Sequence, residues 1–487
     1  MILNSIDRHI LAIIALVYFF SAKGYIEVLD TRYSLMTAEA IISRGRMDIP
    51  PVDGASLKGL DGRIYSKYGI GLPLYYTPFV LAGSILSRMT HFPADEITGF
   101  LISFANIPFA LFTVILFIQL LRLFGAPNPY LWLLAVGLGL GTLGWRYASS
   151  DFSEMMQTAL LLLAVYGVIC MTTASVLAGG LGLAGLILVK LVHLSLFPIF
   201  LVYLLFRPGK PGPQRIREAA LFAGPVILCI ILIAGLNLIR FGNPLESGYG
   251  AEMRLFFPTQ LWHTLPRLLF SLDKGLFIFS PILLLGLFGW RAFFRQRPWD
   301  AGLCGALCLV NLVLAGAWHS WMGGWSWGPR LLVPAIPLWF LPAAFWLSRP
   351  GSRGRVVGTV LLLMGSVLVQ FPGILVKDQE IHHIRYNMCT PEEQSHMPPD
   401  YVAALIMLSH KIIHRNELYH ISEFGIPGNR ELDLSEYRTF QGFNLWTDHI
   451  ARRFLAPEVR WLPVLGLLLA SALVISVPRM IKETILS

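Results

Sequence analysis

A few ionisable residues interrupt an otherwise apolar sequence, and their types are suited to acid–base and anion-binding chemistry. Asp30 follows the first apolar run, and Lys67 lies between Tyr65 and Tyr68 in a stretch rich in glycine. A positioned carboxylate can accept a proton from a hydroxyl group, and an ammonium group can bind an anion. Each residue also has a plainer explanation. Asp30 could pair with Arg32 at a helix end, and Lys67 could be an interfacial lysine that extends toward water.

Two further carboxylates, Asp151 and Glu154, stand at the beginning of the apolar run 154–173. Acidic residues in the first turn of a helix interact favourably with the helix dipole, which is the plainer explanation. Together with Asp30 they could instead complete an acidic site. A divalent cation could bind there if the three carboxylates meet in space, although their spacing alone does not establish it.

Three basic residues occupy the ends of apolar runs. Lys190 and His193 lie in a tight turn between two such runs, and Lys274 begins another. Ionisable groups at membrane depth are costly and are by default candidates for function. These three are expected near the membrane surface, where both the cost and the inference are smaller.

The most specific stretch is 318–330, which reads WHSWMGGWSWGPR. Its tryptophans could form the aromatic belt found at membrane surfaces. A belt does not need the glycine pair or the Gly-Pro-Arg corner, however, and such a corner lets the backbone approach a ligand closely. An arginine is suited to bidentate phosphate binding, and indole faces stack on sugar rings. The pattern therefore favours a ligand-binding site that contains Trp321, Trp325, Trp327 and Arg330.

The elements that must hold these residues are membrane-spanning helices. Of the 487 residues, 55% are hydrophobic and 14% are charged, and the mean hydropathy is +0.62. Soluble domains contain about 25% charged residues, and one spanning helix needs about 20 apolar residues. The sequence therefore predicts an all-α polytopic membrane protein with about twelve spans. We expect these spans at 8–25, 97–121, 129–147, 154–173, 175–189, 191–206, 218–239, 276–293, 301–317, 331–348, 356–376 and 461–477.

The distribution of basic residues predicts the orientation, because cytoplasmic loops carry an excess of Lys and Arg. The side of the membrane on which the basic clusters lie depends on whether the apolar stretch 71–87 crosses it. If it does not cross the membrane, the basic clusters at 207–217, 291–297 and 349–355 all lie in the cytoplasm together with both termini. If it crosses, all of them lie outside. We therefore expect 71–87, which is interrupted by prolines, to lie along the outer face or to re-enter the membrane.

This orientation places the candidate residues on the external side and divides the chain into three parts. Residues 1–377 form a transmembrane module, in which the external loop 26–96 carries juxtamembrane helices. Residues 378–460 form a small external cap, because their aliphatic and aromatic content is too high for disorder. Residues 461–487 contain the last span and a cytoplasmic tail. The net charge of +9 is explained by the cytoplasmic loops, and no nucleic-acid partner is expected.

The external combination of a carboxylate, separated cations and aromatic rings suits transfer of a sugar from a lipid phosphate. A hydroxyl acceptor needs a base, which Asp30 could supply. A departing polyprenyl phosphate needs positive charge held in place around it. The candidate cations are Lys67, Lys190, Lys274 and Arg330.

These motifs follow one another in an order, and lie on one expected side of the membrane, in a way that resembles the GT-C glycosyltransferases. The similar branch contains the protein O-mannosyltransferases and the aminoarabinose transferase that modifies lipid A. Members of this branch carry an Asp-Glu pair after the first span, followed by Arg-Tyr. Here the sequence is Asp30-Thr31-Arg32-Tyr33. Thr31 replaces the second acidic residue, which leaves Asp30 as the sole candidate base.

Further positions match the same pattern over about residues 1–345. Lys67 resembles the family lysine that precedes a membrane-surface helix, and 71–87 would be that helix. Glu154 resembles the acidic position that opens the fourth span, and Lys190 resembles the basic residue that ends the fifth. The segments that look like motifs of a bacterial subgroup are 241–249, 274–277 and 324–330.

The resemblance implies a polyprenyl-phosphate-linked monosaccharide as donor, with inversion of its anomeric carbon. The acceptor would be a hydroxyl of an envelope glycan, lipid or protein, as in modification of lipopolysaccharide or cell-wall glycans, on the periplasmic side of a bacterial inner membrane. No cofactor is required on this basis, and a divalent cation at Asp30, Asp151 and Glu154 is the alternative. The residues expected to contact sugar or acceptor are Tyr33, Tyr65, Tyr68, Asp151, Glu154, His193, Tyr249, Trp321, Trp325 and Trp327.

A transporter or flippase for lipid-linked sugars is the main alternative function. It would use the same cations to hold phosphate, but it would also need polar residues along a path through the bilayer. Most strongly polar groups are expected outside, with Asn237 and Asn311 among few exceptions. A non-catalytic scaffold is a third alternative, and it leaves the clustering of cations and tryptophans unexplained.

Overall fold

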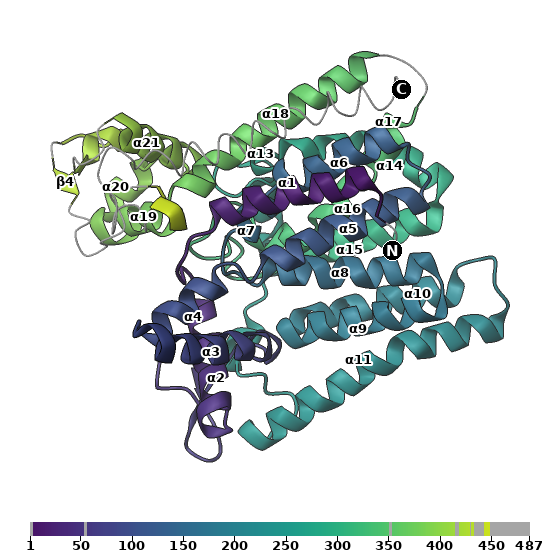
Figure 1. Cartoon of the computed structure of the whole chain (residues 1–487), viewed down its shortest axis with the longest axis horizontal. Coiled ribbons are helices and arrows are strands. Elements are labelled where there is room, and N and C mark those ends of the chain that lie inside the picture. The colour runs from purple at the N-terminus through teal and green to yellow at the C-terminus, as the bar shows by residue number, and fades with distance from the viewer. Residues whose placement is uncertain are drawn as a thin grey trace.

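The computed structural model describes residues 3–52, 56–349, 353–413, 418–428, 430–432 and 443–448. In this part of the chain the helices form a bundle, with a smaller group of elements at one end of it (Figure 1). The strands found among these residues form two short antiparallel pairs, β1 with β2 and β3 with β4. The predicted last span at 461–477 lies outside the described residues.

The bundle is built from apolar helices, several of which follow one another with little interruption. Its elements are α1 (Ser5–Ser21), α5 (Ile107–Leu123), α6 (Asn128–Leu140), α7 (Gly144–Ala148), α8 (Glu154–Cys170), α9 (Thr173–Val189), η1 (Leu191–Leu196), α10 (Phe197–Phe206), α11 (Gly212–Phe241), α13 (Leu276–Phe279), η4 (Pro281–Leu283), α14 (Leu284–Gln296), α15 (Pro298–Ala317), η5 (Arg330–Ala335), α16 (Ile336–Phe340), α17 (Ala343–Leu347) and α18 (Arg353–Leu375).

Shorter elements connect these helices or lie at their ends. They are α2 (Leu29–Arg44), β1 (Ser56–Lys58), β2 (Ile64–Ser66), α3 (Gly71–Thr90), α4 (Ala94–Ile102), η2 (Gly250–Arg254), η3 (Pro258–Gln260), α12 (Leu261–Phe270), α19 (Asp378–His383), η6 (Ile384–Met388), α20 (Pro391–His396), α21 (Asp400–Ile413), β3 (Tyr419–His420), η7 (Ile421–Phe424) and β4 (Glu431–Leu432).

Every predicted span within the described residues coincides with one apolar helix or with consecutive helices. The span 276–293 is divided at Pro281 and the span 331–348 at several prolines, because proline lacks the amide hydrogen that continues a helix. The protein is therefore an all-α, multi-pass membrane protein. The helical segments long and apolar enough to cross a membrane are 94–123, 212–241, 298–317, 330–347 and 354–375, with shorter apolar helices at 128–140, 154–170, 173–189 and 191–206.

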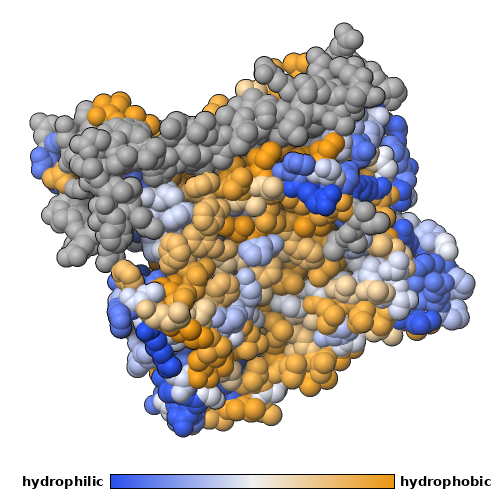
Figure 2. Space-filling view, viewed as in Figure 1, coloured by the Kyte–Doolittle hydropathy of each residue, from blue (hydrophilic) through white to orange (hydrophobic). Residues whose placement is uncertain are grey.

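The basic clusters that the sequence assigns to the cytoplasm meet at one end of the bundle. Arg122 at the end of α5 pairs with Asp7 in α1. Arg207 after α10 lies 3.8 Å from Asp300 in α15, and Arg297 donates a hydrogen bond of 3.2 Å to the Leu123 carbonyl. Helices α2, α3, α4 and α19 lie at the opposite end (Figure 1), and Figure 2 shows a mainly apolar surface between hydrophilic ends.

The ambiguous stretch 71–87 forms α3, which belongs to the end of the bundle that carries α2. It packs against α2 and α4, and its residues Leu72, Tyr76 and Val80 join Leu35 of α2 in one buried cluster. Gly69 and Gly71 allow the start of α3 to pack against the end of α9. A Cβ atom on Gly69 would lie 2.3 Å from the Leu188 carbonyl oxygen, so only glycine fits there without a shift.

The described part of the segment 378–460 forms a small helical unit held by buried ion pairs. Lys411 in α21 lies 3.0 Å from Glu380 in α19. Arg385 lies 2.7 Å from Asp400, and Asp400 lies 3.3 Å from Lys274 of the bundle. The helical unit that follows residue 377 and the bundle are therefore joined by charged contacts as well as by apolar packing.

Candidate functional site

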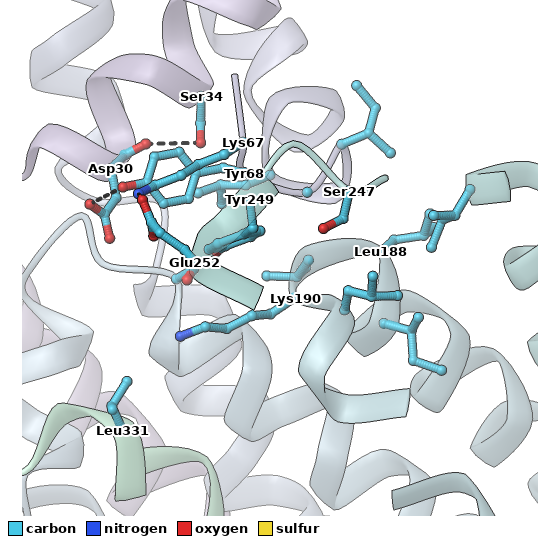
Figure 3. A pocket seen from close by; sticks show the side chains of 18 of the residues that line it. Asp30, Ser34, Lys67, Tyr68, Leu188, Lys190, Ser247, Tyr249, Glu252 and Leu331 are labelled. Atoms are coloured by element: carbon cyan, nitrogen blue, oxygen red, sulfur yellow. Dashed lines mark hydrogen bonds and ion pairs between the residues drawn. The ribbon is translucent and has the colours of Figure 1, made fainter. Parts of the chain in front are cut away.

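A cavity of about 340 Å³ lies at the end of the bundle that carries α2. Its walls come from α2, the 67–72 segment, the end of α9, the end of α11, the 247–252 segment and the beginning of η5 (Figure 3). The ionisable and aromatic residues that line it are Asp30, Lys67, Tyr68, Glu154, Lys190, Arg240, Tyr249, Glu252, Trp318, His319 and Arg330.

Asp30 lies in the first turn of α2 and presents its carboxylate to this cavity. It accepts a hydrogen bond of 2.8 Å from the Tyr68 hydroxyl and one of 3.2 Å from Arg330 Nη1. Burial alone would raise the pKa of Asp30, but Arg330, the Tyr68 hydroxyl and Lys190 hold it below its usual value. The group is therefore a carboxylate at neutral pH. Its side chain is 39% exposed, so a ligand can reach it.

Arg330 follows a sharp corner in the tryptophan-rich segment. Gly328 in this corner has a φ of +61°, a conformation that glycine adopts most readily. The Arg330 guanidinium lies between Asp30 and Glu154, with its Nε 3.7 Å from Glu154 Oε1. That distance is too long for a hydrogen bond, and Nε has no hydrogen-bond partner among the described residues. Nε is itself buried, and the guanidinium as a whole lines the cavity between the two carboxylates.

Lys67 and Lys190 approach the cavity from two other sides. Lys67 Nζ lies 2.8 Å from Glu252 Oε1 and 5.6 Å from the centre of the Tyr249 ring. Lys190 ends α9 and is directed into the same space (Figure 3). Burial lowers the pKa of Lys190, although Glu154 and Asp30 oppose that shift.

The charges that line the cavity leave it with an excess of positive charge. Its cations are Lys67, Lys190, Arg240 and Arg330, and its carboxylates are Asp30, Glu154 and Glu252. With all groups ionised, the described lining carries one net positive charge. A monoanionic ligand such as a phosphodiester would balance it.

Several residues expected from the sequence lie near the cavity without lining it. The Tyr33 ring stacks on Tyr68 with 6.0 Å between centres and 12° between planes. The Tyr65 hydroxyl donates a hydrogen bond of 2.8 Å to Asp61. The buried His193 ring lies 2.8 Å from Gln157 Oε1.

Lys274 and the tryptophans 321, 325 and 327 lie outside the cavity lining. The Lys274 ammonium is fully buried, donates to the Ser326 carbonyl and lies near Asp400. Trp327 packs edge-on against Phe279, and Trp321 is half-buried against the core. Trp325 is 38% exposed and lies parallel to Tyr386, at 6.3 Å. The tryptophan-rich segment therefore reaches the cavity at Arg330, whereas Trp325 contacts α19 and η6.

Of the three carboxylates that could have bound a metal ion, Asp30 and Glu154 both lie beside Arg330, whereas Asp151 is engaged elsewhere. Asp151 accepts hydrogen bonds from the backbone amides of Glu27, at 3.3 Å, and Val28, at 3.1 Å. Asp30 is directed at Arg330 and Tyr68, as described above. Among the described residues, no group of three or more His, Cys, Asp or Glu side chains is placed to hold a metal ion.

Residues that the sequence did not single out complete the cavity. Arg240 and Glu252 flank the 241–249 motif, so that motif could have drawn attention to them. Trp318 and His319 begin the tryptophan-rich segment. The pairing of Lys67 with Glu252 joins residues far apart in the chain, and no local pattern signals it.

No known family and no curated protein matches this sequence. Solved structures match it over most of its length. ArnT from Cupriavidus metallidurans in the apo state has a TM-score of 0.50 and 15% identity, over 82% of this chain and 70% of that chain. The same protein bound to undecaprenyl phosphate has a TM-score of 0.48 and 15% identity, over 98% and 77%.

A second similar structure comes from an archaeal protein. The oligosaccharyltransferase AglB from Archaeoglobus fulgidus, in complex with an inhibitory peptide and a dolichol-phosphate, has a TM-score of 0.50 and 10% identity. The match covers 87% of this chain and 60% of that chain. The chain therefore has the GT-C fold that the order of its motifs predicted, and it shares that fold with ArnT and AglB.

Proposed function

We propose that this protein is an inverting glycosyltransferase. It would move a monosaccharide from a polyprenyl-phosphate carrier to a hydroxyl group of an envelope glycan, lipid or protein, on the external face of a bacterial inner membrane. One observation carries the proposal: a reachable carboxylate, Asp30, shares one cavity with cations from four separate segments. The fold supports it, because the similar AglB structure holds a dolichol-phosphate.

Asp30 is the general base of the proposed reaction. The acceptor hydroxyl gives its proton to the Asp30 carboxylate while its oxygen bonds to the anomeric carbon of the sugar. The bond between that carbon and the phosphate oxygen breaks at the same time, and its electron pair leaves with the polyprenyl phosphate. Because one displacement occurs from the face opposite the phosphate, the configuration of the anomeric carbon inverts.

The cations stabilise the departing phosphate. Its negative charge increases as the bond breaks, so positive groups held in place lower the barrier. Arg330 offers its guanidinium and Lys190 its ammonium, and both residues line the cavity. Lys67 becomes available when Glu252 moves aside, since the two groups are paired at 2.8 Å in this structure.

The sugar and the acceptor are expected to contact the aromatic wall. Tyr68, Tyr249 and Trp318 line the cavity, and Tyr33 supports Tyr68 from behind. Glu154 lies across Arg330 from Asp30 and can accept a hydrogen bond from a sugar hydroxyl. Aromatic faces with polar groups at their edges suit a ring that presents both C–H and O–H groups.

The proposed reaction uses no cofactor. A divalent cation would have to displace Arg330 from Asp30, or the backbone amides from Asp151, before it could be bound by both. We therefore expect turnover to persist in a chelator such as EDTA. Loss of turnover that returns with added Mg²⁺ or Mn²⁺ would support the metal-dependent alternative.

Comparison of the lipids and glycans of cells that have or lack the protein tests the proposal. Mass spectrometry should find one species in the producing cells that is heavier by a single monosaccharide. That species identifies sugar and acceptor together. If reconstituted vesicles instead move the lipid-linked sugar across the bilayer without forming product, the protein is a transporter.

Asp30→Asn tests the assigned base. Removing one general base typically slows a reaction by about 100-fold to 10,000-fold, so we expect turnover to fall by at least the lower figure. Binding of undecaprenyl phosphate should stay unchanged or become tighter, because Arg330 loses one of its two carboxylate neighbours. Asp61→Asn is the matched control, since Asp61 lies in an exposed turn and pairs only locally with Arg63 and Tyr65. Turnover at the unsubstituted rate in Asp30→Asn excludes Asp30 as the base.

A further inference from the structure

A buried ion network joins α7 of the bundle to α19 and to the segment that precedes Asp30. Arg146 in α7 lies 3.0 Å from Glu27 Oε2 and 2.7 Å from Asp378 Oδ2 through its Nη2. All three side chains are at most 3% exposed. Glu27 precedes Asp30 by three residues, and Asp378 begins α19. One guanidinium therefore bridges the segment before the proposed base and the external cap.

The external cap, meaning the described residues 378–448, holds the same segment through further contacts. Gln379 Nε2 donates a hydrogen bond of 3.1 Å to the Glu27 carbonyl. Asn444 Nδ2 lies 3.4 Å from Glu27 Oε1, and its Oδ1 accepts a bond of 2.7 Å from the Tyr25 hydroxyl. The Trp446 amide donates to the Ala22 carbonyl at 2.9 Å. The cap thus encloses residues 22–27 along their length.

On its other side, Glu27 is fixed by the bundle. Asp151 accepts hydrogen bonds from the amides of Glu27 and Val28. The Thr31 hydroxyl donates a hydrogen bond of 2.7 Å to the Asp151 carbonyl. Val28 caps α2 without a side-chain hydrogen bond of its own. The start of α2 is therefore held by distant residues, where a helix usually relies on its own capping side chain.

Arg146 lies between two buried carboxylates, those of Glu27 and Asp378. Burial alone would raise the pKa of Glu27, but Arg146 and Lys23 lower it to about 2. A buried charge that loses its partner is strongly unfavourable. Each member consequently constrains the others, and a shift of the cap is transmitted to Glu27.

We propose that Asp378 of the external cap is a positioning residue, which acts through Arg146 and Glu27 to fix the start of α2 and hence the Asp30 carboxylate in the cavity. The inference rests on the proposed function, in which Asp30 is the base. A cap that served stability alone would pack on the bundle surface. Here two of its polar side chains, those of Gln379 and Asn444, contact Glu27, and Asp378 reaches the same residue through Arg146.

Hydrogen exchange measured by mass spectrometry tests the mechanical link without any substrate. Asp378→Asn and Glu27→Gln should speed exchange of the amides of residues 28–33, because the first α2 bond, from the Arg32 amide to the Val28 carbonyl, loses its support. Glu393→Gln is the matched control in the cap, since Glu393 pairs with Arg430 at 3.0 Å on the surface. Unchanged exchange in 28–33 in a folded Asp378→Asn protein overturns the proposal.

Steady-state kinetics with the donor and acceptor identified above test the consequence for the reaction. A misplacement of about 1 Å at a reacting group can cost about 100-fold in rate, so Asp378→Asn should lower kcat strongly. The KM for the donor should change little, because Lys190 and Arg330 are retained. Asp378→Glu should restore part of kcat. A raised KM with normal kcat would mean that the network serves binding and would overturn the positioning role.

Milder variants cover the case in which the charge variants do not fold. Gln379→Ala removes only the donor to the Glu27 carbonyl, and it should raise exchange in 28–33 and lower kcat by a smaller factor. Normal exchange and normal kcat in that variant would also contradict the proposal. If Asp30→Asn retains full turnover while the exchange results hold, the proposed function fails and the link from cap to α2 stands.

Discussion

Lys190 and Arg330 both offer positive charge to the cavity, but only the charge of Lys190 is sensitive to pH. Arginine stays protonated in proteins. Lys190 is buried, and its pKa lies below the usual value for lysine. Its ammonium is charged below that lowered pKa and neutral above it. Part of the positive charge of the proposed phosphate site is therefore lost as the pH rises.

We expect the affinity for undecaprenyl phosphate to weaken at an alkaline pH that would leave an ordinary lysine charged. Lys190→Arg should remove that weakening, because its guanidinium keeps its charge. The measurement is binding of undecaprenyl phosphate in detergent from neutral to alkaline pH. Lys58→Arg is a suitable control, since Lys58 is exposed in β1. Identical pH profiles for the unsubstituted protein and Lys190→Arg would show that Lys190 does not hold the phosphate.

At the scale of elements, the site depends on the close approach of the 67–72 segment to the end of α9. This contact brings Lys67 to the same cavity as Lys190. Gly69 permits it, because a side chain there would meet the Leu188 carbonyl oxygen at 2.3 Å. Backbone atoms cannot move aside as the end of a flexible side chain can.

Gly69→Ala should therefore push the two elements apart. Overpacking of this kind costs about 1–3 kcal/mol, and it should both lower the thermal unfolding temperature and reduce turnover. Gly224→Ala in α11 is the matched control, since no atom lies within 4 Å of the Cβ it would add. Stability and turnover like those of the control would show that the contact is more adaptable than its geometry indicates.

The sequence predicted which elements share an end of the molecule, and this followed from hydropathy and the distribution of basic residues. Asp30, Lys67, Lys190 and Arg330 were placed together in this way, and the structure puts all four in one cavity. Individual partners could not be predicted. Lys274 was expected beside them, but it is buried and lies 3.3 Å from Asp400, because the folding of the segment that begins at Asp378 decides which charges meet.

The contact partners of the carboxylates and of the cap residues could not be predicted from the sequence either. Asp151 was expected in the site, but its oxygens are engaged by the backbone amides before Asp30. A sequence pattern gives the side of the membrane on which a residue lies. It does not give the direction of a side chain within a loop, which depends on contacts such as that between Arg146 and Asp378.

At the scale of the whole molecule, the two polar ends of the bundle should face opposite sides of the membrane. Asp61 lies in the exposed turn between β1 and β2, near the cavity end, and Lys210 lies in the turn between α10 and α11 at the basic end. The positive-inside rule assigns the basic end to the cytoplasm. The proposed function requires that orientation, because the cavity must face outward.

Single cysteines test this arrangement. In spheroplasts, Asp61→Cys should react with a membrane-impermeant maleimide, and Lys210→Cys should react only after permeabilisation. The natural cysteines give a low background, because all are buried or half-buried. The opposite labelling pattern would place the cavity in the cytoplasm and contradict the proposed location of the reaction.

The contact between Arg330 and Asp30 has a consequence for the timing of the reaction. The guanidinium lies 3.2 Å from the carboxylate, and this pairing would make Asp30, the proposed base, a weak one. A phosphate that draws on Arg330 weakens this pair and adds negative charge nearby, and both effects raise the proton affinity of Asp30. The base gains strength only after the lipid-linked sugar has arrived. Under the proposed function, Asp30 would be too weak a base to activate water before the lipid binds, and substrates should add in a fixed order with the lipid first.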